Sequence, residues 1–220
     1  MTPGRIGPLG PGRPGGPKFR LVPGSLEVAN TAARCRTWDE LAAGCRVCTA
    51  CPELVRSRGQ VVVGDAPARA RAVLVGEAPG AQEDAAGRPF VGRAGQLLDE
   101  LLTRAGLRRA ELAVLNVVQC RPPGNRAPRS EEIARCRGWL ERKLDLLGSD
   151  LVCALGLTAA GWFLGRGGSL SRLRGRVHPV AGRRVVVTYH PAAAVRFGPA
   201  GAPRAALAED LELLARLMDE

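Results

Sequence analysis

The stretch from residue 72 to residue 102 constrains the fold of this chain more than any other. It begins with five apolar or glycine residues, Ala72 to Gly76, which are typical of a buried parallel strand. The sequence GEAPG then interrupts regular structure, because glycine and proline disfavour both helix and strand. Four leucines between residues 97 and 102 recur at helical spacing, and Gly106 marks the helix end. Open α/β folds place their ligands in such a loop after a parallel strand.

The rest of the chain repeats this alternation of strand and helix. Further core strands are predicted at residues 112–118, 151–155 and 185–188, and a short strand at residues 61–63. A capping box at Thr37 predicts a helix that stops near Gly44, Ser130 is expected to cap another helix, and a last helix follows Pro203. We therefore expect an α/β fold: one three-layer domain with a central, mainly parallel, four-stranded sheet.

Composition sets the domain limits and the expected compartment. Residues 1–24 are rich in proline and glycine and contain no acidic residue, so we expect a disordered basic tail before one domain over residues 25–220. The chain has no run of about eighteen apolar residues and no signal-peptide core, so we expect a cytoplasmic protein without a membrane partner. Thiols stay reduced there, so the seven cysteines indicate a metal site rather than disulfides.

The charge distribution points to a polyanionic partner. The formal net charge is +11, and residues 151–208 contain no acidic residue. The chain has only two lysines, so a bias toward arginine is present, but that bias does not explain the missing acids. We therefore favour a phosphate-contacting surface over an ordinary solvated basic face. The segment carries eight arginines: Arg166, Arg172, Arg174, Arg176, Arg183, Arg184, Arg196 and Arg204.

Five of the cysteines have spacings typical of a metal centre. Cys45, Cys48 and Cys51 form an overlapping CxxCxxC, which brings three thiolates within reach of one metal. Cys120 and Cys136 flank an Arg-Pro-Pro segment later in the chain. Zinc also accepts four thiolates, so the spacing alone leaves zinc and an iron–sulfur cluster both open.

The ordered motifs resemble one known family. GEAPG, the acidic pair Glu83-Asp84, GRPFVGRAG and a later HPAAAVR, which begins at His190, are similar to the motifs of the family 4 uracil-DNA glycosylases, the iron–sulfur branch of that superfamily. The match covers roughly residues 45–200. A phosphate-binding loop is a weaker interpretation of GEAPG, because no Gly-Lys-Ser/Thr follows it and the acidic residues would repel phosphate.

The resemblance implies a fold, a reaction and a cofactor. It implies a uracil-DNA glycosylase-like domain that acts on DNA containing uracil and holds a [4Fe–4S] cluster. The ligands that it implies are Cys48, Cys51, Cys120 and Cys136. Cys45 complicates the choice, since it forms a second CxxC with Cys48, but the pair Cys48/Cys51 is followed shortly by a leucine, as in the family.

Two residues are candidates for recognising the base. A flipped base needs an aromatic partner for stacking and polar groups that pair with its edge. Phe90 lies between two glycines of the first motif and is the stacking candidate. Asn116, near the end of a predicted strand, can pair with O4 and N3–H of uracil because an amide offers a donor and an acceptor. Gly76 and Ala78, within GEAPG, are expected to line the same substrate site.

Three residues are candidates for the chemical step. His190 can donate to uracil O2, where negative charge accumulates as the base leaves. Glu77 is the first candidate, and Glu83 the second, for a carboxylate that orients water and stabilises the sugar cation. The only lysines are Lys18, in the tail, and Lys143, outside every motif. A monofunctional enzyme that leaves an abasic site is therefore predicted, because strand cleavage generally needs an amine nucleophile.

DNA contacts are predicted at the arginines closest to these motifs. Arg121 and Arg126 lie in the Arg-Pro-Pro loop, and Arg196 is the last residue of HPAAAVR. The residues after His-Pro, 192–195, are three alanines and a valine, so any wedge into the base stack is small. A monomer is expected. The alternative function is a non-catalytic iron–sulfur module of the same fold that binds DNA or uracil without cutting.

Overall fold

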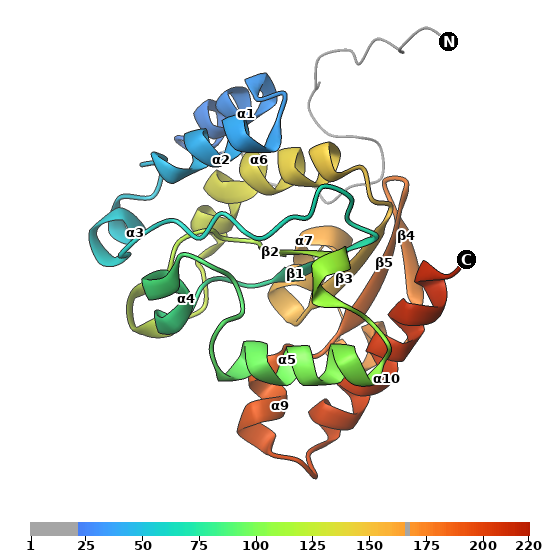
Figure 1. Cartoon of the computed structure of the whole chain (residues 1–220). Helices are drawn as coiled ribbons and strands as arrows, with labels where there is room; N and C mark the ends of the chain where they lie inside the picture. Colours follow the sequence, from blue (N-terminus) through green and yellow to red (C-terminus); the bar gives the residue numbers. More distant parts are fainter. Residues whose placement is uncertain (1–21, 166–167) are drawn as a thin grey trace, which may run out of the picture.

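The computed structural model describes residues 22–165 and 168–220, which form three layers with a sheet in the middle (Figure 1). The strand order is β2-β1-β3-β5-β4, and every neighbouring pair is parallel except β4 with β5. The strands are β1 (Ala72–Gly76), β2 (Leu112–Asn116), β3 (Leu151–Leu155), β4 (Val177–Val180) and β5 (Arg183–Thr188). All residues of β1, β2 and β3 are buried, as expected when helices cover both faces of a parallel sheet.

The predicted fold class is confirmed, but the sheet has five strands rather than four. The additional strand, β4, pairs with β5 through a tight hairpin in which Ala181 and Gly182 have φ of 47° and 79°. Its sequence, VHPV, gives a weak signal because proline cannot donate to a ladder. β4 can nevertheless form because it lies at the edge of the sheet, where a proline is tolerated.

Helices cover both faces of the sheet. One face packs against helices from the N-terminal half and centre of the chain: α1 (Ser25–Arg34), α2 (Trp38–Arg46), α3 (Pro52–Ser57), α6 (Ser130–Leu147) and α7 (Leu157–Leu164). The other face packs against α5 (Arg93–Arg104), α9 (Pro191–Phe197) and α10 (Ala202–Met218) (Figure 1). Two short helices, α4 (Ala81–Ala86) and α8 (Leu170–Leu173), lie in connections.

Three local predictions differ from the structure. Residues 61–63 are buried but are not a strand: the main-chain N of Val62 donates to the carbonyl of Gln119 at 2.8 Å, and Asp65 forms an isolated bridge with Val114 of β2. The helix capped by Thr37 continues past Gly44 to Arg46. Ser130 is the first helical residue of α6 rather than its cap, because the carboxylate of Glu132 accepts from the main-chain N of the preceding Arg129 at 2.7 Å.

The predicted tail lies almost entirely outside the described residues, as do Lys18 and Arg166. The boundary at residue 25 coincides with the first residue of α1, but the domain limits stay a prediction. In the part of the chain that the structure describes, no helix has both the length and the apolar character needed to cross a membrane.

Candidate active site

The parallel strands bring the predicted site residues to one edge of the sheet. Gly76, the last residue of β1, pairs in register with Asn116, the last residue of β2. Further along the strand order, Leu155, the last residue of β3, pairs with Thr188, the last residue of β5. Thr188 lies two residues before His190. Glu77 directly follows β1, so three segments far apart in the sequence meet where their strands end.

Gly76 allows an aromatic ring and an amide to approach each other closely. A methyl group built on Gly76 would lie 2.5 Å from Oδ1 of Asn116 and 2.6 Å from Cζ of Phe90, so any side chain there would displace both. Asn116 is 3% exposed, and its Oδ1 has no hydrogen-bond partner among the described residues. A buried amide oxygen without a partner is costly. An acceptor beside an aromatic ring is suited to a planar ligand with an N–H group.

Phe90 has a backbone conformation that its surroundings must hold in place. Its φ is 53°, in the left-handed region that residues other than glycine rarely adopt. Its carbonyl accepts from Nη1 of Arg109 at 3.1 Å, and Nη2 of Arg109 donates to the carbonyl of Pro89 at 2.7 Å. Gly95 leaves room for the same carbonyl, since a methyl group built there would lie 1.8 Å from it. No sequence pattern indicated the roles of Arg109 and Gly95.

Replacing Gly95 with alanine is expected to displace Phe90. Alanine favours a helix by about 1 kcal/mol over glycine, but the clash with the Phe90 carbonyl outweighs that gain. We expect the reaction that takes place at this site to slow by about a hundredfold, because displacements of an ångström in an active site have effects of this size. The matched control is Gly161→Ala in α7, where a methyl group meets nothing within 4 Å. If single-turnover rates of both variants equal that of the parent, Gly95 does not position Phe90.

His190 lies against Phe90 and has a defined tautomer. The two ring centroids are 5.6 Å apart at an interplanar angle of 29°. His190 caps α9, and its Nδ1 accepts from the main-chain N of Ala192 at 3.1 Å. Burial lowers the pKa of His190 to about 4, with a smaller opposing effect of Glu83. At neutral pH the ring is therefore uncharged, and its remaining proton is on Nε2, which can donate to a ligand.

The two candidate carboxylates have different contacts. Glu77 is half-buried, and its Oε2 accepts from the hydroxyl of Thr158, which the sequence analysis did not identify. Glu83 instead holds its loop together, because its carboxylate accepts from the main-chain N of Gly80, Val91 and Gly92 at 3.1, 3.0 and 2.8 Å. These contacts favour Glu77 as the reactive carboxylate. The role of Glu83 in the reaction stays a prediction.

The other acidic residue of the motif has a structural position. Asp84 is buried, and its carboxylate accepts from the main-chain N of Gly59 at 2.8 Å and of Gln60 at 3.2 Å. It therefore links α4 to the segment that follows the cysteine motif. Ala78 lies in the same loop as Glu77 and is half-buried.

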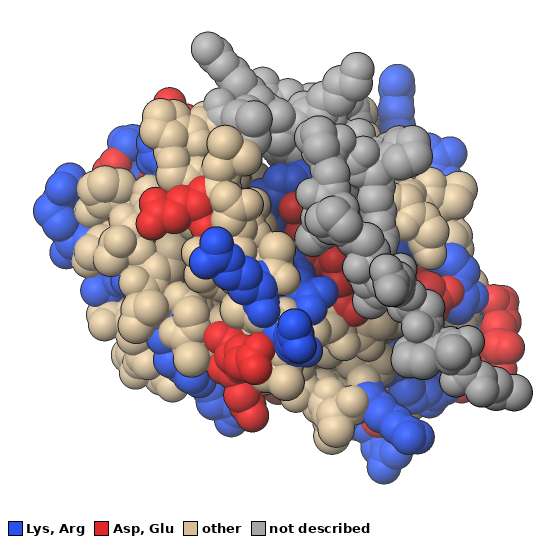
Figure 2. All heavy atoms as spheres, turned by 90° about the horizontal axis from the view of Figure 1, so that it is seen from above, with Lys and Arg blue, Asp and Glu red and all other residues tan. Residues whose placement is uncertain are grey.

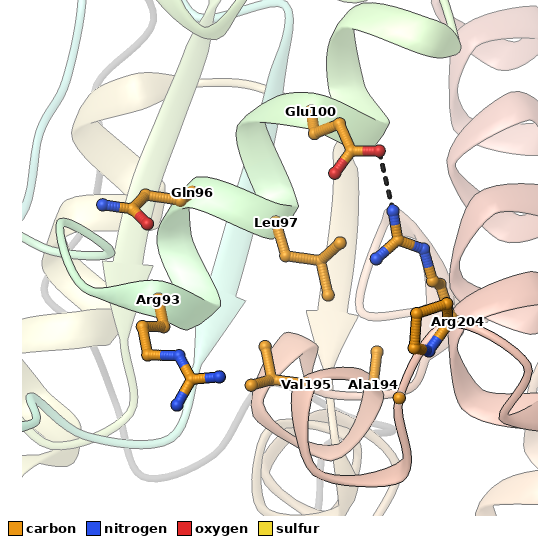
Figure 3. Close-up of a pocket in the computed structure, with 9 residues that line it drawn as sticks. Arg93, Gln96, Leu97, Glu100, Ala194, Val195 and Arg204 are labelled. Atoms are coloured by element: carbon orange, nitrogen blue, oxygen red, sulfur yellow. Dashed lines mark hydrogen bonds and ion pairs between the residues drawn. The ribbon is translucent and has the colours of Figure 1, made fainter.

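Of the four positions of helix α9 considered for a wedge, residues 192–195, only Ala192 is exposed. Ala194 is buried and Val195 is half-buried, and both line a surface hollow of about 350 Å³ between α9, α5 and α10. Figure 3 shows these side chains facing Leu97. At the right of the view, Arg204 forms an ion pair with Glu100, with a distance of 2.7 Å between the charged atoms. The exposed apolar side chain of this helix is Phe197, which is 59% exposed and lies under the guanidinium of Arg196 at 5.0 Å.

Many of the arginines that suggested a basic face are paired with acids from other parts of the chain. The view from above in Figure 2 shows basic and acidic side chains interspersed rather than gathered in one basic patch. Within the described residues, Arg172, Arg176 and Arg196 form no ion pair. The paired arginines of the segment are Arg174 with Glu209 and Asp210, Arg183 with Asp145, Arg184 with Asp150 and Glu220, and Arg204 with Glu100. The lack of acids between residues 151 and 208 therefore does not by itself indicate a free basic surface.

The Arg-Pro-Pro loop also differs from the prediction of DNA contacts. Arg126 donates to both carboxylate oxygens of Glu132 and to Glu53, so its guanidinium ties the segment after the cysteine motif to α6. Its geometry is that of an internal link rather than of a free phosphate contact. Arg121 is half-buried, and its Nε donates to Oδ1 of Asn125 at 2.7 Å, which leaves its terminal nitrogens available.

Five of the cysteines, at positions 45, 48, 51, 120 and 136, lie close enough to influence one another electrostatically, but they do not form a closed ligand set within the described residues. All seven thiols are free, and among the described residues no three His, Cys, Asp or Glu side chains are placed to hold a metal ion. Nη1 of Arg58 donates to Sγ of Cys120 at 2.9 Å, and Nη2 donates to the carbonyl of Cys48 at 2.8 Å. Burial raises the pKa of Cys45 to about 11 and that of Cys51 to about 12.

Comparisons with known proteins indicate one family for this chain. Residues 63–212 match the family model described as the uracil DNA glycosylase superfamily. A type-4 uracil-DNA glycosylase of Thermotoga maritima is 46% identical over 68% of this chain and 78% of the relative. Proteins of the same name from Pyrobaculum aerophilum and Archaeoglobus fulgidus are 43% and 40% identical over 68% of this chain and 80% and 77% of their own lengths.

The fold and the edge that carries Asn116, Phe90 and His190 thus define a member of the uracil-DNA glycosylase superfamily. Within it, the chain belongs to the type-4 uracil-DNA glycosylases, as the identity to relatives from three organisms shows. The resemblance noted in the sequence is therefore confirmed.

Proposed function

We propose that this chain is a DNA-repair enzyme that hydrolytically excises uracil from DNA and leaves an abasic site. The observation that carries this proposal is the buried Oδ1 of Asn116, which has no partner in the described residues and lies beside the ring of Phe90. Uracil is planar and offers N3–H next to a carbonyl, so it satisfies both the amide and the ring.

Asn116 reads the base edge in this proposal. Its Oδ1 accepts from N3–H of uracil, and its Nδ2 donates to O4. Cytosine presents an acceptor at N3 and an amino group at position 4, so an amide held in this orientation rejects it. The close approach that Gly76 allows lets the base stack on Phe90 while it pairs with Asn116.

His190 and Glu77 serve the bond-breaking step. The bond between N1 and C1′ breaks with its electron pair going to uracil, and Nε2–H of His190 stabilises the charge at O2. The sugar carries the positive charge, and the carboxylate of Glu77 stabilises it and orients water. The water oxygen bonds to C1′, and the proton it loses is accepted by Glu77. The hydroxyl of Thr158 holds that carboxylate in place.

A monofunctional reaction fits the positions of the amines. Lys143 is fully buried and donates to the carbonyl of Val63 at 2.5 Å, so it is not available to attack a sugar. The other lysine, Lys18, lies outside the described residues. Cleavage of the strand through an amine adduct is therefore not part of the proposal.

We also propose a [4Fe–4S] cluster with Cys48, Cys51, Cys120 and Cys136 as its ligands. The chemistry of these four residues suits such a cluster, because all four thiols are free to bind iron. Two basic side chains, Arg58 and Lys143, lie nearby and would balance the negative charge of the thiolates. When bound, the cluster supplies a covalent link between the N-terminal segment, the Arg-Pro-Pro loop and α6. Cys45 is buried among the same groups, and it is the alternative ligand.

Replacing Cys136 with alanine is expected to release the metal and to lower the free energy of unfolding by more than about 3 kcal/mol, because metal binding contributes to folding. The matched control is Cys153→Ala, at another buried cysteine, which lies in β3 and outside the proposed ligand set. Iron content and denaturant unfolding measure both effects. If Cys45→Ala loses the metal while Cys51→Ala keeps it, the ligand assignment is wrong.

Arg196 is the proposed phosphate contact near the active site. It is exposed, is the last residue of the His190 motif on α9 and forms no ion pair in the described residues. Its guanidinium over the exposed ring of Phe197 places a cation and an aromatic side by side, a combination suited to a nucleic-acid strand. Arg121 is a second candidate.

The experiment that tests the function uses two oligonucleotides that differ only by uracil or cytosine at one position. The purified protein is incubated with each, and abasic sites are revealed by alkali on a denaturing gel. We expect cleavage after alkali only at uracil, and intact strands without alkali. Selective binding of the uracil strand with no abasic sites would instead support the alternative, a non-catalytic binding module.

A further inference from the structure

Lys143 is a buried cation that the proposed reaction does not use. It is 0% exposed, and it lies on α6 seven residues after Cys136, which puts the two side chains on the same face of the helix. Its ammonium donates to the carbonyl of Val63 at 2.5 Å and to Oε1 of Gln119. Because a buried charge is costly unless it is balanced and hydrogen-bonded, a lysine at this position requires an explanation.

Gln119 connects this cation to the base-reading strand. It is 1% exposed, directly precedes Cys120, and its Nε2 donates to the main-chain carbonyl of Asn116 at 2.8 Å. An ammonium has donors only, so Gln119 must turn its oxygen toward Lys143 and its amino group toward Asn116. The lysine thus fixes the orientation of the glutamine amide, and the amide fixes the turn that follows Asn116.

We propose that Lys143 and Gln119 form a strut through which the cysteine centre holds Asn116 in its base-reading orientation. The strut begins beside Cys136 and Cys120 and ends on the main chain of Asn116, whose buried Oδ1 has no hydrogen-bond partner among the described residues. Both residues are positioning residues, and the proposal rests on the proposed function. Thiolate ligands are negatively charged, so a loaded metal centre stabilises the ammonium and keeps the strut in place.

If this strut is present, discrimination between uracil and cytosine depends on Gln119, although Gln119 would touch neither the base nor the sugar. In Gln119→Glu the carboxylate still accepts from Lys143, but it cannot donate to the Asn116 carbonyl, and two acceptors then face each other. We expect Gln119→Glu to keep the iron content of the parent. Inhibition by free uracil and the preference for uracil over cytosine should each fall by about tenfold, because a loss of this size corresponds to one hydrogen bond. Lys143→Met should cause the same losses and also reduce iron content.

The experiment measures single-turnover release of uracil and cytosine, inhibition by free uracil, and iron content for the parent and each variant. The matched control is Gln96→Glu, the same substitution at an exposed position of α5, which should keep the parent's values. If iron-loaded Gln119→Glu has the parent's discrimination and inhibition, the strut is refuted. If the parent itself releases no uracil, the proposed function fails instead, so the two failures are distinguishable.

Discussion

Replacing His190 with alanine is expected to reduce the single-turnover rate of uracil excision by about a hundredfold or more, the usual cost of a lost donor to a developing oxyanion. The substitution removes Nε2–H, and it also removes the cap of α9 that Nδ1 provides. His190→Asn separates the two effects, because asparagine is a good N-cap but has no ring nitrogen at the position of Nε2. Both variants should be slow. His178→Ala, at a histidine on β4 that contacts the carbonyl of Leu173, is the control.

The pH dependence of the parent follows from the same residue. Because burial lowers the pKa of His190 to about 4, the imidazole stays neutral as the pH falls from 8 to 5, and its Nε2–H is present throughout. The rate should therefore be flat with respect to this group across that range. A charged donor with an ordinary pKa of about 6.5 would instead give a rate that rises as the pH falls through that value. An increase of this kind would contradict the neutral tautomer.

Replacing Glu77 with glutamine is expected to leave binding of uracil-containing DNA intact while it reduces the rate by a factor of about 10² to 10⁴. The amide oxygen of glutamine can still accept from Thr158, so the side chain keeps its position and loses only its charge and basicity. Binding constants and single-turnover rates separate the two effects.

The comparison that decides between the two acidic candidates is Glu83→Gln. Glu83 accepts from three main-chain N–H groups, so the amide should weaken the loop and lower stability more than it changes the chemical step. A full rate for Glu77→Gln with a slow Glu83→Gln would move the reactive carboxylate to Glu83.

The strand-end residues could be predicted because the strongest sequence patterns were local. The apolar run to Gly76 and the one around Leu115 have the composition of buried strands, and a parallel sheet places their ends on one edge. Asn116, Phe90 and His190 therefore come together as expected. Strand β4 was missed because Pro179 and a short length weaken its signal.

Other features depend on contacts between distant segments, which no local pattern encodes. The eight arginines between residues 151 and 208 suggested a basic face, but four of them pair with acids from other parts of the chain, such as Asp145 and Glu100. The bond from Thr158 to Glu77 spans 81 residues, and the one from Lys143 to Gln119 joins two separate elements. Thr158 is the third residue after the end of β3, and this position close to a strand end was the one available signal.

The central claim is that Asn116 reads the edge of a uracil bound at this site, and Asn116→Asp tests it most directly. A carboxylate cannot donate to uracil O4, but it can accept from the amino group of cytosine. The measurement is the ratio of single-turnover rates for release of uracil and of cytosine from otherwise identical oligonucleotides. We predict that the parent strongly favours uracil and that the ratio falls by at least about tenfold in Asn116→Asp, as expected when a hydrogen bond is replaced by an opposed pair. An unchanged ratio in a folded, active Asn116→Asp would contradict the account.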